Sequence, residues 1–326
     1  MDTTALTRDE FVVRKERLYH GLFAGFALLT ILVTVGIILT LSGRTITFFL
    51  QVSPVEFFTG TTWSPIIGGQ YGVLPLVSGT LLVTVFSAII ALPVGLAAAI
   101  YLSEYASERA RSILKPALEI LAGVPTVIYG YMALVYITPV FRGFLPIRAT
   151  IIPAGTPLPE FVFVIPELGT FNVLSASIVV GIMIIPMVSS ISEDALNAVP
   201  DSLRQAAYGL GSTKFDVSTK VVVPAATSGI VSSYVLAISR AIGETMAVVM
   251  AMGMSPQMPY FPNVFRNLAE SGQTITSAMV QIAQADSLGG ATYEAMFALG
   301  MTLFVITLSM NVLAEVVRRR FREDYE

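Results

Sequence analysis

The sequence contains no cysteine, one histidine and one tryptophan, and it is poor in charged residues. Without cysteine the chain can form neither disulfide bonds nor metal sites that need thiolate ligands. The single histidine, His20, does not make a metal site on its own, so we expect no metal and no cofactor. Aspartate, glutamate, lysine and arginine supply only 13% of the residues, whereas soluble domains average about 25%. This scarcity of charge argues against a soluble globular protein.

Apolar residues dominate instead. Hydrophobic residues make up 54% of the 326 positions, and the mean hydropathy is +0.75. A helix needs roughly 20 mostly apolar residues to cross the hydrocarbon core of a lipid bilayer. The first apolar segment is longer than a signal-peptide h-region of roughly 7 to 15 residues, so we expect an uncleaved anchor. The sequence predicts an all-α, polytopic membrane protein with six transmembrane helices, at residues 19–41, 73–102, 115–139, 173–191, 224–253 and 291–317.

The distribution of lysine and arginine predicts the orientation. Of the 19 basic residues, fourteen fall in the two termini and in the loops on one side of the predicted membrane. Arg44, Arg142, Arg148 and Arg266 fall on the other side, and Arg240 lies inside a span. Because cytoplasmic loops carry an excess of lysine and arginine, we expect both termini in the cytoplasm. The small net charge of -3 does not by itself decide about nucleic acid, and we expect none as a partner.

The loops predicted on the outer side are long and rich in turn-forming residues. Residues 42–72 contain Trp63 and other aromatic residues, and we interpret them as a short interfacial helix whose rings lie at headgroup level. A docking surface for an external partner is the alternative. Residues 141–172 and 254–290 each contain several prolines, so we expect irregular segments outside the bilayer. The aromatic residues that accompany Trp63 in this interpretation are Phe57, Phe58 and Tyr71.

Prolines and glycines interrupt the predicted spans. Pro75 and Pro93 lie in the second span, Gly123-Val124-Pro125 and Gly130 in the third, and Pro186 in the fourth. An interior proline frees a carbonyl and can bend a helix. Such breaks are tolerated where protein or a water-filled cavity satisfies the backbone. As a set they favour a transport pathway, although proline and glycine are also generally common in membrane helices.

A strict spacing pattern occupies the loop between the fourth and fifth predicted spans. Gln205-Ala206-Ala207 is followed after three residues by Gly211 and, after nine more, by Val221-Val222-Val223-Pro224. We predict two short helical pieces, because the two alanines allow close packing of a partner and Gly211 permits a sharp bend. Pro224 is expected at the first position of the next helix, where its missing N–H costs nothing. An ordinary amphipathic loop is the alternative.

Two charged residues lie deep in the fifth predicted span. Arg240 and Glu244 are far from both ends of residues 224–253, and a charge at such depth costs on the order of 2.5–3.5 kcal/mol on insertion scales. Such residues normally face a bundle interior or a cavity and pair with a partner. On one continuous helix, residues four apart share a face and can contact each other. Small residues near that face would let another helix approach closely; they are Gly229, Ser233 and Ala237.

This pair admits two interpretations. It can be a buried ion pair that only fixes helix packing. It can also be a site on the path of an anion, because a guanidinium presents planar donors that match phosphate-type oxyanions. In the second case, we expect the carboxylate of Glu244 to keep Arg240 from holding the anion too tightly.

The loop spacing resembles the EAA loop of ABC importer permeases, in which E-A-A, three residues, G, nine residues and I-x-L-P form a helix that docks into a groove on the ATPase. The sequence departs from this pattern at Gln205, which replaces the usual glutamate, and at Val221 and Val223. The change at Gln205 removes a charge but keeps the helical surface. The resemblance implies that the ATPase-coupling residues are Gln205, Ala206, Ala207, Gly211 and Pro224.

A longer resemblance covers the chain from about Tyr71 onward. The runs 240–248, 123–130 and 274–278 are similar to those of the PstC permeases of phosphate ABC importers. This resemblance implies the MetI-like ABC importer permease fold, located in the plasma or inner membrane, with Arg240 and Glu244 on the substrate pathway. It also implies a permease core at residues 71–326 with the coupling loop at 192–224. Residues 1–70 would form a cytoplasmic N-terminus, the first helix and an outer interfacial segment.

The same resemblance implies the partners. These are a PstA-like second permease subunit, a PstB-like ATPase dimer and a PstS-like phosphate-binding protein on the outer side. The sequence has no G-x-x-x-x-G-K-[ST] motif, so we expect no enzyme activity of its own and an energy supply from the ATPase. The expected mechanism is alternating access, in which Pro224 passes a movement of the loop to the fifth helix.

Other functions remain open at this point. A permease for sulfate or molybdate would carry similar residues, because a separate binding protein supplies most of the discrimination between oxyanions. A proton-coupled secondary anion transporter would use Arg240 and Glu244 without an ATPase, but it leaves the loop spacing unexplained. A scaffold protein would use the pair and the loop only for packing and docking.

Overall fold

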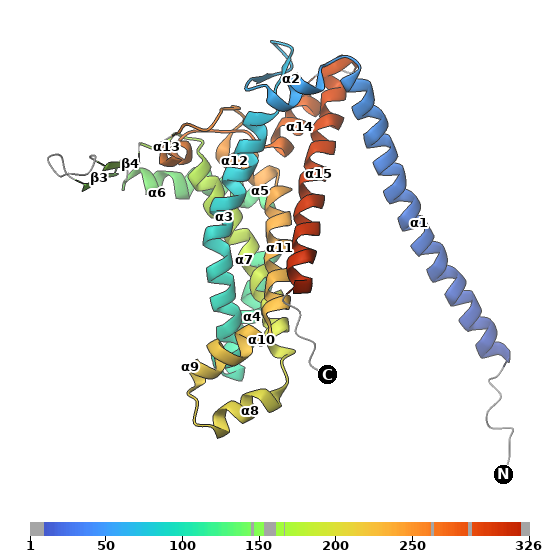
Figure 1. The fold of residues 1–326 in the computed structure, drawn as a ribbon, viewed down its shortest axis with the longest axis vertical. Helices are drawn as coiled ribbons and strands as arrows, with labels where there is room; N and C mark the ends of the chain where they lie inside the picture. Colours follow the sequence, from blue (N-terminus) through green and yellow to red (C-terminus); the bar gives the residue numbers. More distant parts are fainter. Residues whose placement is uncertain are drawn as a thin grey trace.

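The chain forms an elongated, predominantly helical bundle (Figure 1). This agrees with the predicted all-α class, to which two small antiparallel hairpins are added. The computed structural model describes residues 10–144, 147–152, 161–165, 167–261, 264–285 and 289–320.

Four helices of the described residues are long and apolar enough to cross a membrane. Two further helix pairs meet the same criterion if each bent pair counts as one span, which gives up to six spans. The predicted number is therefore reached only when both bent pairs are included. The four unbroken helices are α1 (Glu10–Phe49), α3 (Leu74–Ile100), α7 (Val173–Asn197) and α15 (Gly290–Arg320).

The first bent pair replaces the continuous helix predicted at residues 115–139. The chain turns by 90° after Gly123, where Val124 adopts an extended conformation. Pro125 explains the break, because proline disfavours helical angles in the residue before it and lacks an N–H donor. The helical pieces of this region are α4 (Glu108–Gly123), α5 (Thr126–Met132), the π-helical turn η3 (Ala133–Ile137) and α6 (Thr138–Arg142).

The second bent pair shows that Pro224 does not begin a helix as predicted. The hydroxyl of Thr213 accepts a hydrogen bond from the backbone N–H of Asp216 (3.2 Å) and caps a helical stretch that starts at Lys214. This stretch includes Pro224 and is followed by a bend of 71°. The stretch consists of α9 (Lys214–Val217), the π-helical turn η4 (Ser218–Val222) and α10 (Val223–Ala225). Helix α8 (Asp201–Gly209) precedes it, and α11 (Thr227–Ile242) follows the bend.

The bundle is centred on α7. Helix α3 packs along its length, and α11 crosses it with a face of small residues. The hydroxyls of Ser192 on α7 and Ser233 on α11 are hydrogen-bonded at 2.7 Å. A Cβ atom added to Gly229 would lie 2.4 Å from Cβ of Ala195, so only glycine permits this approach. The predicted close packing at Gly229, Ser233 and Ala237 is confirmed, because the last two are fully buried.

Helix α1 leaves the bundle. It lies against α15 near Phe49 and then diverges from it (Figure 1), so the apolar window within it has no buried residue. Its 40 residues would span about 60 Å at 1.5 Å per residue, twice the thickness of the hydrocarbon core. Near the contact, Arg44 donates a hydrogen bond to the carboxylate of Glu294 on α15 (2.8 Å).

Three of the four aromatic residues for which an interfacial position was predicted are instead packed in protein, and only Phe58 is half-exposed. Phe57 lies on the short helix α2 (Pro54–Thr59), and its ring meets that of Phe48 edge-on, with 5.4 Å between centroids. Trp63 and Tyr71 are also buried. They pair across a hairpin and cover α14 (Ile275–Gln284) and α15, two helices more than 200 residues later in the chain. The hairpin strands are β1 (Trp63–Ser64) and β2 (Gln70–Tyr71).

The other two outer loops are more regular than predicted. Residues 141–172 contain an antiparallel hairpin, and residues 254–290 contain two helices. In the second helix, Thr274 and Ser277 form a reciprocal capping box, which explains its start. The prolines at 146, 153, 157, 159, 166 and 262 lie outside the described residues. The elements are β3 (Ile147–Ile152), β4 (Phe161–Ile165), α13 (Val264–Ala269) and α14 (Ile275–Gln284).

The two ends of the bundle differ. The start of α1, the end of α15 and helix α8 lie at one end, whereas α2 and α14 lie at the other (Figure 1). This is the arrangement expected for an even number of crossings with both termini and the 192–224 loop on one side. That this side is the cytoplasm remains a prediction from the basic residues.

Replacing Gly229 with alanine is expected to destabilise the protein. The added Cβ would force α11 away from the rigid methyl group of Ala195, and such overpacking typically costs about 1–3 kcal/mol. Gly36→Ala is the matched control, because nothing lies within 4 Å of a Cβ atom on that exposed helical glycine. Thermal unfolding of both variants in the same detergent checks the expectation. Equal midpoints would contradict the described contact between α7 and α11.

Candidate functional site

Arg240 and Glu244 lie at an interruption between two helices, not on one continuous helix. Helix α11 ends at Ile242, and α12 (Met246–Met252) begins three residues after Gly243. The predicted span 224–253 is therefore divided here as well as at the bend after Pro224. The pair nevertheless stays close, because Nη2 of Arg240 lies 3.9 Å from Oε2 of Glu244. This distance allows electrostatic attraction but is too long for a hydrogen bond.

The two side chains differ sharply in exposure. The side chain of Arg240 is 48% exposed, whereas that of Glu244 is only 3% exposed. Glu244 therefore faces the protein interior, whereas Arg240 faces a cavity; both are positions expected for a charge at this depth. Arg240 keeps most of its donor capacity available to a solute, because the ion pair uses little of it.

Glu244 is held in place by its neighbours. Its Oε1 accepts a hydrogen bond from the backbone N–H of Ala247 (3.2 Å), which satisfies a free donor in the first turn of α12. Its backbone carbonyl accepts a second bond from the hydroxyl of Thr276 on α14 (2.8 Å). The carboxylate thus has a structural role at the break, in addition to facing Arg240.

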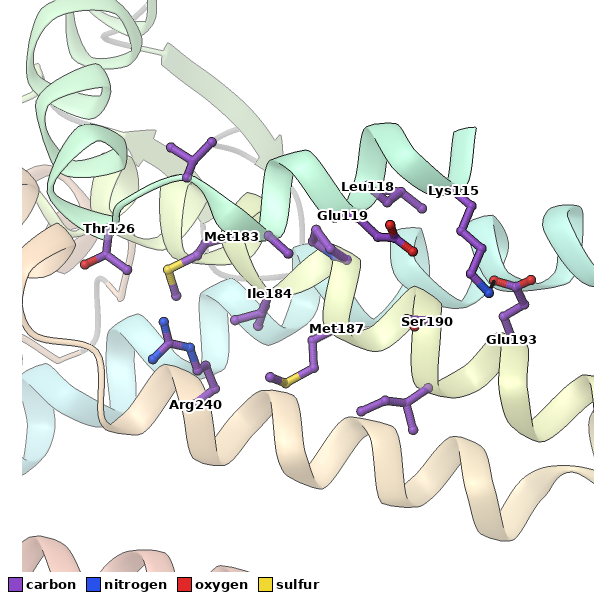
Figure 2. Close-up of a pocket in the computed structure, with 14 residues that line it drawn as sticks. Lys115, Leu118, Glu119, Thr126, Met183, Ile184, Met187, Ser190, Glu193 and Arg240 are labelled. Atoms are coloured by element: carbon purple, nitrogen blue, oxygen red, sulfur yellow. Dashed lines mark ion pairs between the residues drawn. The ribbon is translucent and has the colours of Figure 1, made fainter. Parts of the chain in front are cut away.

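Arg240 lines a cavity between α4, α7 and α11. The cavity has a volume of about 330 Å³. Figure 2 shows Arg240 at one end of it and the Lys115–Glu193 ion pair at the other. The wall between the two ends is mainly apolar and includes Met183, Ile184 and Met187. The charged groups of the lining are Arg240 at one end and Lys115 paired with Glu193 at the other, with Glu119 between them, so an anion entering the cavity would meet an available cation at the Arg240 end.

Lys115 and Glu193 are members of the site that sequence reasoning missed. Glu193 is almost completely buried, and Lys115 Nζ lies 3.4 Å from its Oε2. Arg111 Nε donates to Oε1 of the same carboxylate at 3.0 Å. Glu193 follows the predicted end of the fourth span by two residues, and that position was the one available signal. A second acidic group, Glu119, lines the cavity between its two ends and is exposed.

The residues of the 192–224 loop form the predicted pair of helical pieces with a turn between them. Gln205 and Ala206 lie exposed on α8, and Ala207 is half-buried against the core below it. Gly211 has a φ of +85°, a backbone conformation that residues other than glycine rarely adopt, so the predicted bend is confirmed. Exposed apolar side chains flank this turn; they are Tyr208, Leu210 and Phe215.

Comparison with known proteins gives a consistent result. Residues 91–323 match the family described as binding-protein-dependent transport system inner membrane component. The chain is 32% identical over 297 residues to the probable ABC transporter permease protein YqgH of Bacillus subtilis, covering 90% of this chain and 88% of that protein. It is 34% identical over 274 residues to the phosphate transport system permease protein PstC of Xylella fastidiosa, covering 83% and 81%. With PstC of Haemophilus influenzae it shares 32% over 313 residues, 94% of each chain.

The fold is also that of solved transporters. A bacterial alginate ABC transporter in complex with its periplasmic protein matches with a TM-score of 0.60 and 15% identity, over 95% of this chain and 96% of that chain. The MetNI methionine ABC transporter matches with a TM-score of 0.52 and 16% identity, over 80% of this chain and all of that chain. These likenesses support the MetI-like fold. The chain belongs to the family of binding-protein-dependent transport system inner membrane components, the multi-pass permeases of ABC importers in the inner membrane.

Proposed function

We propose that this permease forms one half of the translocation pathway of an ATP-driven phosphate importer, and that Arg240 is its anion-binding residue. The observation that carries the proposal is the half-exposed guanidinium at the end of a cavity whose wall is otherwise mainly apolar. The names of relatives at 32–34% identity supply the cargo, since several are phosphate transport permeases.

The geometry explains how Arg240 could bind an anion without trapping it. A guanidinium matches the oxygens of phosphate with paired, charge-assisted hydrogen bonds. Glu244 is held beside Arg240 by a hydrogen bond from the N–H of Ala247 (3.2 Å). At 3.9 Å its negative charge repels a phosphate on Arg240 and thereby weakens the binding. A moderate affinity is what a transport site requires, because the anion has to leave on the other side.

Partner subunits would drive the conformational changes of this permease. Membership of the family implies an ATPase and a substrate-binding protein, and we propose that they are PstB-like and PstS-like, with a PstA-like subunit forming the second half of the pathway. The core would be residues 71–326, preceded by a separate segment at residues 1–70. Within the 192–224 loop, Gln205, Ala206, Ala207, Gly211 and Pro224 would receive the movement of the ATPase. Alternating access then requires that phosphate contacts the two states of the bundle differently.

Two alternatives, another oxyanion as substrate and a proton-coupled mechanism, can be tested against this proposal. Sulfate or molybdate would fit the same guanidinium, so the complete importer should be assayed for uptake of labelled phosphate with each oxyanion as competitor. A proton-coupled secondary transporter would lose uptake when an ionophore collapses the proton gradient. ATP-dependent uptake that resists the ionophore and is not displaced by sulfate or molybdate is the expected result.

Arg240→Gln is expected to abolish phosphate uptake while the importer still assembles. Glutamine keeps much of the side-chain volume but loses the charge and the planar set of five donors that binds an oxyanion. Uptake by proteoliposomes containing the complete importer measures the effect, and affinity pull-down of the partner subunits measures assembly. Arg109→Gln is the matched control, because that arginine is exposed on α4 and does not line the cavity. Uptake by Arg240→Gln near the level of the control would show that the pathway is assigned wrongly.

Two substitutions of Glu244 are expected to separate its two roles. Glu244→Gln keeps an oxygen that can accept from the Ala247 N–H but removes the charge, so stability is retained while phosphate turnover slows because the anion leaves Arg240 more slowly. Glu244→Ala also removes the acceptor, and loss of a comparable helix cap costs about 0.5–2 kcal/mol. Thermal unfolding and uptake at saturating phosphate distinguish the variants. Identical unfolding midpoints for the two would contradict the capping role.

Gly211→Pro is expected to uncouple ATP hydrolysis from transport or to release the ATPase. Proline fixes φ near -65°, whereas this position has a φ of +85°, so the turn between α8 and α9 must change. Gly209→Ala is the control, because nothing lies within 4 Å of a Cβ atom there and its φ is not positive. ATPase recovery after pull-down and phosphate transported per ATP hydrolysed are the two measurements. Normal values of both for Gly211→Pro would rule out the coupling role of this turn.

A further inference from the structure

Arg204 is the least exposed side chain among the charged residues of α8. The helix as a whole buries no residue, and its neighbours Gln205 and Ala206 are exposed. The side chain of Arg204, by contrast, is only 14% exposed. It turns from the helix surface towards the bundle and adds polar contacts to the apolar packing of Leu203 and Ala207.

The guanidinium of Arg204 bridges three segments of the chain. Its Nη2 and Nε donate to Oε1 of Glu104 at 3.0 and 3.3 Å. Glu104 belongs to the π-helical turn η2 (Tyr101–Tyr105) that ends α3. Two further bonds run to backbone carbonyls at the end of α7 and just beyond it, from Nη2 to Leu196 (2.7 Å) and from Nη1 to Val199 (2.6 Å). One side chain therefore fastens α8 to the ends of both α3 and α7.

Burial makes this attachment costly to break. The carboxylate of Glu104 is 6% exposed, so removal of Arg204 would leave a buried carboxylate without this cation. The arginine also forms an ion pair with Asp201 at 3.2 Å, but that carboxylate is 84% exposed. Exposed pairs of this kind contribute little. The two carboxylates that contact Arg204 are thus a strong and a weak partner of the same cation.

Helices α3 and α7 are joined to each other at the same level. The hydroxyl of Ser103 in η2 donates to the side-chain oxygen of Asn197 at the end of α7 (2.9 Å). Above this point the two helices pack along their length. A displacement of α8 that pulls on Arg204 therefore acts on both helices together. Helix α7 carries Met183, Ile184, Met187 and Glu193, which line the cavity beside Arg240.

The route along the chain is less direct. Between α8 and α11 it passes the glycine turn at Gly211 and the bend of 71° after α10. We propose that Arg204 and Glu104 form the mechanical link through which movement of α8 reaches the cavity wall on α7, and that Arg204 is a positioning residue for transport. This inference rests on the proposed function and adds a second route to the one through Pro224.

The test uses the complete importer, with its ATPase and binding protein, in proteoliposomes. Glu104→Gln and Arg204→Gln are each expected to lower the phosphate transported per ATP hydrolysed by about tenfold or more, because a buried partner is lost, while ATP hydrolysis continues. Asp201→Asn is the matched control, since it removes the exposed partner of the same arginine, and its ratio should be unchanged. The double variant Glu104→Gln with Arg204→Gln should be no worse than Arg204→Gln alone, because the arginine substitution already removes the contact with Glu104. Wild-type ratios in both single variants would overturn the link.

A second measurement does not depend on transport. Because the chain has no cysteine, spin labels can be attached at Asp194→Cys on α7 and Tyr208→Cys on α8. With the link intact, we expect the distance between the labels to stay narrow and constant when ATP binds. In the Glu104→Gln background the distribution should broaden. Equal distributions in the two backgrounds would overturn the link even if transport were impaired for another reason.

Failure of this inference can be told apart from failure of the proposed function. If Arg240→Gln abolishes uptake while Glu104→Gln and Arg204→Gln keep the wild-type ratio, the link is wrong and the anion pathway stands. If Arg240→Gln transports normally while the two link variants uncouple hydrolysis from transport, the anion pathway is wrong and the link stands.

Discussion

The structure depends on the cost of burying a carboxylate, which has to be met by a cation from elsewhere in the chain. Four glutamates among the described residues illustrate this, and each has an arginine within 4 Å: Glu104, Glu193, Glu244 and Glu294. Three of these pairs join segments that are far apart in sequence. In a bundle whose outer surface is apolar, such pairs are the specific connections between helices, because apolar contacts with lipid and with protein are of similar value.

The four pairs are not equivalent. At Glu193, Glu244 and Glu294 the arginine side chain is between 40% and 53% exposed, and only Arg204 is withdrawn from solvent together with its partner. Arg204 also bonds two backbone carbonyls, whereas Arg240 makes no hydrogen bond to Glu244 at 3.9 Å. The most buried of these pairs, Arg204–Glu104, therefore holds the 192–224 loop, whereas the longest, Arg240–Glu244, lies at the cavity. A rigid connection suits the transfer of movement, and a loose one suits a group that has to exchange partners with a solute.

The sequence predicts those features that depend on local chemistry. Apolar runs of sufficient length indicate the spans, and the spacing around Gly211 indicates a turn that only glycine forms easily. The positions at which the spans are interrupted could not be predicted from local chemistry. The end of α11 depends on Glu244 reaching back to cap α12 and on Thr276, 32 positions later, bonding its carbonyl. The same holds for Trp63, whose burial depends on helices near the other end of the chain, and for Lys115 and Glu193, which meet only because α4 folds back along α7.

The exposure of Arg240 also bears on how the subunit is made. In the proposed arrangement, a copy that enters the bilayer before it meets a second subunit would leave a half-exposed guanidinium at membrane depth, at a cost on the order of 2.5–3.5 kcal/mol on insertion scales. Pairing with a second wall would enclose the cavity and remove this cost, so assembly is favoured by the same residue that is assigned to the anion. An unassembled copy would therefore differ from an assembled one by a charged group exposed within the membrane.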